Sequence, residues 1–308
     1  MSNTPSLNRR GFLRAAAIAV AAGTVGTVGA ALPQARAQGA ILGTVIDYSA
    51  GVPSAAAVKA AGHLGAVRYV SGRRPGAEWM LGKPVTAAET QDFANHGLAV
   101  ASVYQYGKDA TADWKQGALG AATHAPQAIS YHRAAGGPTG RPIYVAIDDN
   151  PTRAQYDTQI RPYLQAFQAA LQLAGYQTGV YGNYSVIDWA VQDGIGQYFW
   201  MHNWGSNGQI HPRTTLHQIR IDKDTIDGVG IDLNNVYAQD WGQWQPGQAG
   251  TPAPSIPSAP SVPSTQPAPL VEVPLNVSSL PGLNANGSSV TAADLQRFGD
   301  LTQDVMRL

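Results

Sequence analysis

Short apolar runs alternate with longer, more polar stretches between residues 41 and 235, and this alternation predicts the fold. The runs are rich in β-branched residues, which is typical of strands buried on both faces of a parallel sheet. Eight such strands are predicted, at residues 41–46, 66–70, 98–104, 143–147, 178–181, 198–202, 215–221 and 229–233.

Helices are predicted between most of these strands. The clearest covers residues 152–174, where apolar residues recur every three or four positions before Gly175. Thr86 and Glu89 have the Thr-x-x-Glu spacing of a capping box, and a helix to residue 95 follows. Further helices are predicted at residues 53–61, 111–134 and 185–192.

Strands that alternate with helices over roughly 200 residues predict an α/β fold with a parallel sheet, and the economical closed form is a (β/α)8 TIM barrel. An open doubly wound sheet is the alternative. That fold usually carries a Gly-rich phosphate-binding loop after its first strand, whereas Asp47, Tyr48 and Ser49 occupy this place. We therefore expect the barrel, over residues 38–245.

The amino-terminal residues resemble an export signal. Arg9 and Arg10 form a twin-arginine pair, an uncharged weakly hydrophobic stretch covers residues 15–32, and Ala35-Arg36-Ala37 fits a cleavage site. We expect a signal peptide at residues 1–37, although an uncleaved membrane anchor is the alternative. The prediction is an exported protein, extracellular or associated with the cell wall, with no membrane contact after cleavage.

The composition changes at the carboxyl-terminal end. Residues 246–270 are rich in Pro, Ser and Ala and predict an extended linker. Residues 271–308 predict a tail with a short amphipathic helix, whose apolar stripe begins at Leu295.

Charge and cysteine content exclude several function classes. Without residues 1–37 the chain has 16 basic and 20 acidic residues, a net charge of about −4, which argues against nucleic acid as a partner. The absence of cysteine excludes disulfides and thiolate chemistry. The seven histidines lack zinc-protease spacing, so we expect neither a metal nor a cofactor.

Polar and aromatic residues gather where the predicted strands end, which is where barrel enzymes build their active sites. Asp47, Asp148 and Asp232 follow three different strands, so we predict that they share one cleft. Carboxylates with aromatic and amide neighbours suit sugar binding and glycoside hydrolysis. The predicted substrate-binding residues are Tyr48, Arg73, Tyr104, Gln105, Tyr181, Asn183, Trp200, His202, Gln218 and Asn234.

Four segments in order carry a family resemblance. They are residues 43–49 (Gly-Thr-Val-Ile-Asp-Tyr-Ser), 144–148 (Tyr-Val-Ala-Ile-Asp), 179–184 (Gly-Val-Tyr-Gly-Asn-Tyr) and 230–234 (Gly-Ile-Asp-Leu-Asn). The chain resembles the lysozyme-type muramidases of glycoside hydrolase family 25, and more closely their bacterial glycoside-hydrolase-like relatives. The resemblance implies a barrel over roughly residues 40–240 and places Asp47, Asp148 and Asp232 at the family's aspartate positions.

One position departs from the muramidase pattern. The family's general acid is a Glu, and its place falls on Asn150, whose amide cannot protonate a leaving glycosidic oxygen. Two substitutes are open. Asp149 is adjacent, although successive side chains on a strand point to opposite faces, and Glu78 lies in the loop after the second strand.

These observations predict an exported, monomeric, cell-wall-directed glycoside-hydrolase-like protein whose partner is peptidoglycan or another cell-envelope glycan. Two functions stay open. The barrel hydrolyses glycan strands through its strand-end carboxylates, with Asp149 or Glu78 as the acid. Alternatively, it is a catalytically inactive carbohydrate-binding or envelope interaction protein on the same fold.

Overall fold

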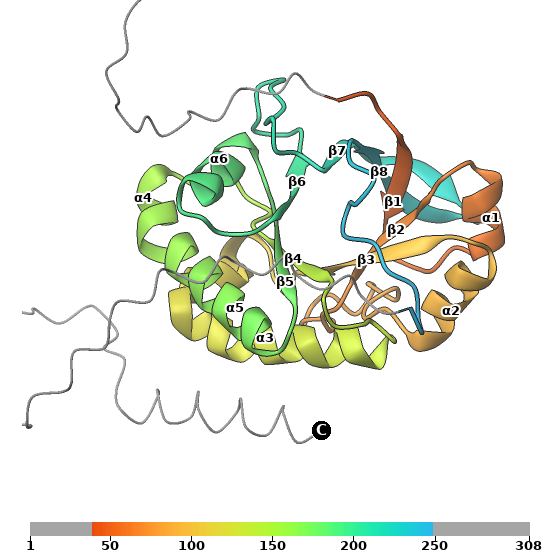
Figure 1. Ribbon diagram of the computed structural model, residues 1–308, viewed down its shortest axis with the longest axis horizontal. Coiled ribbons are helices and arrows are strands. Elements are labelled where there is room, and N and C mark those ends of the chain that lie inside the picture. The colour runs from red at the N-terminus through yellow and green to blue at the C-terminus, as the bar shows by residue number, and fades with distance from the viewer. Residues whose placement is uncertain (1–38, 249–308) are drawn as a thin grey trace, which may run out of the picture. The chain divides into compact units, whose positions relative to one another are not determined.

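The computed structural model describes residues 39–248, and its eight strands close into a barrel in sequence order (Figure 1). Hydrogen bonds join each strand to the next, and the last strand to the first. This confirms the predicted barrel. The strands are β1 (Gly43–Asp47), β2 (Gly65–Tyr69), β3 (Ala99–Tyr104), β4 (Pro142–Ala146), β5 (Gln177–Gly182), β6 (Tyr198–His202), β7 (Leu216–Ile226) and β8 (Val229–Val236).

The last strand differs from the expectation of a parallel sheet, because β8 runs antiparallel to both β7 and β1. A hairpin joins β7 to β8, and its turn residues Asp227 and Gly228 have φ of 51° and 74°. Asp-Gly favours such two-residue turns because both residues tolerate positive φ. The reversal brings Asp232 opposite Asp47 in the ladder.

Helices cover the outer face of the sheet (Figure 1), and side chains cap the first turns of several of them. Ser54, Thr86 and Asn183 each accept a hydrogen bond from a backbone amide three residues on. The predicted helix at residues 152–174 is α4, one π-helical turn (Tyr156–Ile160) and α5 in succession. The helices are α1 (Ala55–Ala60), α2 (Ala87–Asn95), α3 (Gly117–Ala134), α4 (Arg153–Gln155), α5 (Arg161–Leu173) and α6 (Tyr184–Gln192), with short 3-10 turns at Asp109–Thr111 and Asp113–Gln116.

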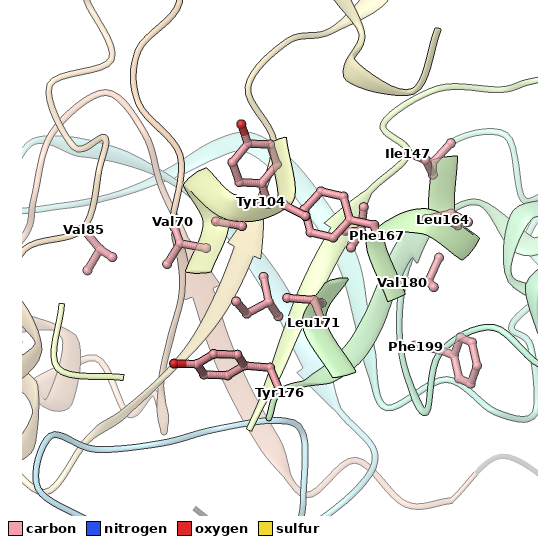
Figure 2. Close-up of a cluster of buried hydrophobic side chains, with 14 of the residues drawn as sticks. Val70, Val85, Tyr104, Ile147, Leu164, Phe167, Leu171, Tyr176, Val180 and Phe199 are labelled. Atoms are coloured by element: carbon pink, nitrogen blue, oxygen red, sulfur yellow. The ribbon is translucent and has the colours of Figure 1, made fainter. Parts of the chain in front are cut away.

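The core has two layers because successive strand side chains point to opposite faces. The outer layer packs strands against helices, and Figure 2 shows Tyr104 of β3 beside Phe167 of α5 in it, their ring centroids 5.6 Å apart. The inner layer fills the barrel with side chains such as Val67, Tyr144 and Trp200. The segment after β8 continues this layer, since Trp241 packs within it and its carbonyl accepts a hydrogen bond from Tyr144 Oη at 2.8 Å.

A buried ion pair connects barrel strand β2 to helix α2 on the outer face of the sheet. The Arg68 guanidinium bonds the Glu89 carboxylate, and the two side chains are 1% and 4% exposed. Arg68 also donates to the main-chain carbonyls of Tyr48 and Gly82, while Tyr48 Oη donates to Glu89 at 2.8 Å. Arg68 and Glu89 therefore tie the loops that follow β1 and β2 to helix α2.

The predicted signal peptide (1–37) and tail (271–308) lie outside the described residues, as does the predicted linker from residue 249. Among the helices of residues 39–248, none is both long and apolar enough to cross a membrane.

Candidate active site

A pocket opens at the carboxyl edge of the parallel strands. Its empty volume is about 370 Å³, including space that is open to solvent. Its lining residues are Asp47, Tyr69, Gln105, Lys108, Asp148, Tyr181, Trp200, Trp204, Gln218, Ile221 and Asp232. The three predicted aspartates thus share one pocket, as the sequence pattern indicates.

One amide side chain joins two of the carboxyl groups. Gln218 Nε2 donates to Asp47 Oδ2 at 3.0 Å and to Asp232 Oδ2 at 3.1 Å. Asn234 Nδ2 also donates to Asp47 Oδ2, at 2.8 Å, and Asn234 is itself held by Trp200 Nε1 at 2.7 Å. Asn234 therefore lies behind the pocket wall and orients Asp47.

Burial favours the neutral form of both carboxyl groups. Burial raises the pKa of Asp47 well above its ordinary value, and the Asp232 carboxylate adds to this rise. Burial also raises the pKa of Asp232 to about 6, assisted by the charges of Asp222 and Asp148 and opposed by the hydrogen bond that Asp222 N donates. Asp232 can therefore hold a proton near neutral pH.

Asp148 has different partners. Its Oδ2 lies 2.9 Å from Lys108 Nζ and accepts a hydrogen bond from Gln105 Nε2 at 3.0 Å. Tyr181 Oη lies 3.4 Å from Oδ1 and donates to Gln218 Oε1 at 2.7 Å. Asp148 is thus ion-paired, and Tyr181 and Gln218 connect it to the Asp47–Asp232 pair.

Aromatic rings form much of the wall. Tyr181 packs against Trp200 with ring centroids 4.3 Å apart. Trp204 stacks on His202 at 4.2 Å, and Lys108 Nζ lies 5.4 Å from the centre of the Trp204 ring. Aromatic faces beside carboxyl and amide groups suit a sugar ring, whose C–H faces stack on aromatic rings while its hydroxyls form hydrogen bonds.

Two tyrosines predicted to bind substrate point away from the pocket. Tyr48 is 3% exposed, packs under Arg68 and bonds Glu89. Tyr104 is fully buried in the outer layer (Figure 2). Its hydroxyl lies 2.6 Å from His124 Nδ1. Each of these tyrosines comes one position after a residue that points into the barrel. Successive side chains on a strand point to opposite faces, so both tyrosines point outward.

The two candidate replacement acids also lie outside the pocket lining. Hydrogen bonds from the amides of Glu78 itself and Gly76 lower the pKa of Glu78, which leaves its side chain ionised at neutral pH. Asp149 Oδ1 accepts a hydrogen bond from Asn150 N at 3.0 Å. Arg73, predicted to bind substrate, is exposed and bonds the Glu78 carbonyl at 3.2 Å.

Asn150 and Asn183 connect loops instead of lining the pocket. Asn183 Oδ1 caps α6, and its Nδ2 donates to Asn150 Oδ1 at 2.9 Å. Gly205 lies so close that a Cβ there would come within 1.7 Å of Asn150 Oδ1. Asn150 therefore fixes the loops after β4, β5 and β6 to one another.

His202 supports the pocket from behind. Burial lowers the pKa of His202 to about 4, so the imidazole is neutral, and its Nδ1 donates to the Trp204 carbonyl at 2.7 Å. Its ring is fully buried against Trp204, which places it outside the lining.

Sequence reasoning missed four lining residues, namely Tyr69, Lys108, Trp204 and Ile221. Tyr69 could have been found from its strand position, because it follows the inward-pointing Val67 by two. Lys108 and Trp204 belong to loops, and Ile221 to the extended arm of β7, so strand periodicity gave no signal for them.

Metal-ligand geometry is absent from this pocket. Among the described residues, no group of three or more acidic, histidine or cysteine side chains is arranged to hold a metal ion. The carboxyl groups of Asp47, Asp148 and Asp232 can transfer protons and stabilise positive charge in this pocket.

Comparison with known proteins gives one family and close relatives. The family model described as "Rv2525c-like, glycoside hydrolase-like domain" matches residues 56–236. A Mycobacterium tuberculosis protein named "Putative peptidoglycan hydrolase Rv2525c" is 49% identical over 241 residues, which cover 78% of this chain and 99% of that protein.

Two crystal structures of the Mycobacterium tuberculosis Tat-secreted protein Rv2525c have the same fold. The complex with L-tartrate has a TM-score of 0.64 and 52% identity, and covers 66% of this chain and 99% of that one. The complex with HEPES has a TM-score of 0.63 and 51% identity over the same shares.

Proposed function

Because the chain belongs to the family of Rv2525c-like, glycoside hydrolase-like domains, we propose that it hydrolyses peptidoglycan glycan strands, using Asp148 and Asp232. The name of the Mycobacterium tuberculosis relative supports peptidoglycan as the substrate. The Arg9-Arg10 motif and the Tat secretion of that relative support export by the twin-arginine route to the cell wall, where we expect the protein to act as a monomer.

The observation that carries the proposal is the contrast between two carboxyl groups in one pocket. Asp148 is ion-paired with Lys108, whereas burial raises the pKa of Asp232 to about 6. Glycosidases need one carboxyl group that donates a proton and one that stays charged, and different environments create this difference.

The proposed reaction assigns one role to each group. Asp232 protonates the glycosidic oxygen as the bond to the anomeric carbon breaks, and the Asp148 carboxylate stabilises the positive charge that develops on the sugar ring. Water then adds to the anomeric carbon and its proton returns to Asp232, so that the enzyme is regenerated. Gln218 and Asp222 N orient Asp232 through hydrogen bonds at 3.1 and 2.9 Å.

Activity should depend on pH through Asp232. The acid acts only while protonated, so kcat/KM should fall about tenfold per pH unit above its pKa of about 6. Release of reducing sugar from purified peptidoglycan between pH 4 and 9 would measure this. A rate that keeps rising above pH 7 would contradict Asp232 as the acid.

A substitution at Asp148 tests the other role. Asp148→Asn keeps the shape but removes the charge, and we expect turnover of peptidoglycan to fall about 10²–10³-fold. Asp157→Asn is the matched control, because Asp157 pairs with Arg153 and Arg161 on the outer helical layer. Equal turnover in wild type and Asp148→Asn would exclude the proposed role.

A second function is favoured by Asn150. This amide stands where the related muramidases carry their acid, and it is occupied in bonding Asn183. A barrel without hydrolysis that still binds glycan strands fits this observation. If the wild type sediments with insoluble peptidoglycan but releases no reducing sugar under any condition tested, the protein is a glycan-binding module.

A further inference from the structure

We propose that Lys83 and Asp113, two buried charged residues outside the pocket lining, are positioning residues that hold the main chain of residues 105–107 so that Gln105 and Lys108 meet at Asp148. The link to catalysis rests on the proposed function, whereas the structural role is tested independently of it.

The turn after β3 presents two side chains to one oxygen. Gln105 Nε2 and Lys108 Nζ lie 3.0 and 2.9 Å from Asp148 Oδ2. Both side chains contain several rotatable bonds, so their convergence depends on where the main chain between them lies. The fixing of residues 105–107 therefore controls the ion pair.

Lys83 fixes the first residue of this turn. Its Nζ donates to the Gln105 carbonyl at 2.6 Å, and Ser71 Oγ donates to the same oxygen at 2.7 Å. The ammonium also lies 4.4 Å from the centre of the Tyr69 ring, which lines the pocket. Lys83 therefore contacts two pocket residues from behind.

Asp113 fixes the next two residues. Its Oδ2 and Oδ1 accept hydrogen bonds from Tyr106 N and Gly107 N, both at 2.8 Å. Gly107 permits this close turn, since a Cβ there would come within 1.8 Å of the Thr111 carbonyl oxygen. Three consecutive main-chain groups are thus bound by Ser71, Lys83 and Asp113.

Burying a charged side chain costs free energy unless hydrogen bonds or an opposite charge compensate for the lost water. Lys83 and Asp113 are each only 4% exposed, and lysine and aspartate are rarely buried so completely. His124 Nε2 lies 3.9 Å from Asp113 Oδ1, but burial lowers the pKa of this imidazole and so disfavours its charged form. The shortest hydrogen bonds of Lys83 and Asp113 go to the main chain of the turn. This placement makes the turn rigid at the point where it supplies Gln105 and Lys108 to the pocket.

The test compares Lys83→Met and Asp113→Asn with the control Lys115→Met. Lys115 is an exposed lysine beside Trp114, so its substitution makes the same charge change as Lys83→Met at a position outside the turn. The first readout is the pKa of Lys108, which is measured by NMR of its ammonium group. The Asp148 carboxylate raises the pKa of Lys108 against the opposing effect of burial.

We expect the pKa of Lys108 to fall toward 10.5 in both variants at the turn and to stay unchanged in Lys115→Met. We also expect kcat on peptidoglycan to fall about tenfold to hundredfold with little change in KM. Folded variants that keep the wild-type pKa of Lys108 would overturn the positioning role.

Two further outcomes are separable. If Lys108 responds but the wild type releases no reducing sugar, the positioning role stands and the proposed hydrolysis fails. If Lys83→Met does not fold, Ser71→Ala removes the other donor to the Gln105 carbonyl. An unchanged pKa of Lys108 in both Ser71→Ala and Asp113→Asn would then overturn the proposal.

Discussion

Replacing Asp232 with Asn is expected to lower hydrolysis of peptidoglycan by about 10²–10⁴-fold and, at the same time, to stabilise the fold at pH 7. The loss follows because an amide cannot donate the proton that a general acid supplies. The isosteric amide can still accept a hydrogen bond from Asp222 N, so the hairpin should stay in place.

The stabilisation follows from the sign of the pKa change. Folding raises the pKa of Asp232 from 3.8 to about 6, so the folded state binds protons more tightly than the unfolded state. Stability is therefore lost as the pH rises from 3.8 through about 6. Because Asp232 is partly open to solvent, the discounted gain from Asp232→Asn at pH 7 is about 2 kcal/mol.

Thermal or denaturant unfolding at pH 3.5 and pH 7 would measure this gain, which should vanish at the lower pH. Asp224→Asn is a suitable control on the same hairpin, because Asp224 lies outside the pocket lining and forms a solvent-accessible ion pair with Arg220. If the Asp232→Asn variant is inactive and also less stable at pH 7, the Asp232 carboxylate stabilises the fold. That result would contradict its role as a general acid whose burial destabilises the fold.

Replacing Arg68 with Met should have the largest effect on stability, a loss of about 3–5 kcal/mol in the free energy of unfolding. Removal of the guanidinium leaves the Glu89 carboxylate buried without its counter-ion, and leaves the carbonyls of Tyr48 and Gly82 without their donor. Urea unfolding followed by circular dichroism would measure the loss.

The double variant Arg68→Met/Glu89→Leu distinguishes a buried charge from lost packing. It removes both charges, so it should be considerably more stable than Arg68→Met alone. For comparison, Arg220→Met breaks an exposed pair and should cost less than about 1 kcal/mol. A double variant no more stable than the single one would show that packing dominates.

The sequence predicts most of the barrel because its strands carry continuous apolar runs and its helices carry clear caps, as Ser54 and Thr86 do. The reversal of β8 was harder to foresee, although Asp227-Gly228 is a strong hairpin signal. The alternation of strands and helices predicts eight equal strand–helix units. The two-residue turn between β7 and β8 leaves no room for a helix, so the last unit differs.

The same limits apply to the site. Asp47, Asp148 and Gln105 were predictable because they end strands and point inward. The prediction that Tyr48 and Tyr104 line the pocket is wrong, because a position at a strand end does not by itself decide which face a side chain points to. Lys108 and Trp204 depend on loop conformations that buried partners determine from far along the sequence, and no local pattern encodes such contacts.

The antiparallel seam between β1 and β8 also has a consequence for folding. Asp47 and Asp232 pair across this seam, so the two ends of the barrel sequence must meet before the acid pair exists. Contacts between residues so distant in sequence form slowly, since loop closure costs entropy before the contact contributes stability. We expect an incompletely closed barrel to titrate Asp232 as an ordinary aspartate, so its raised pKa would mark the moment when the chain has finished folding.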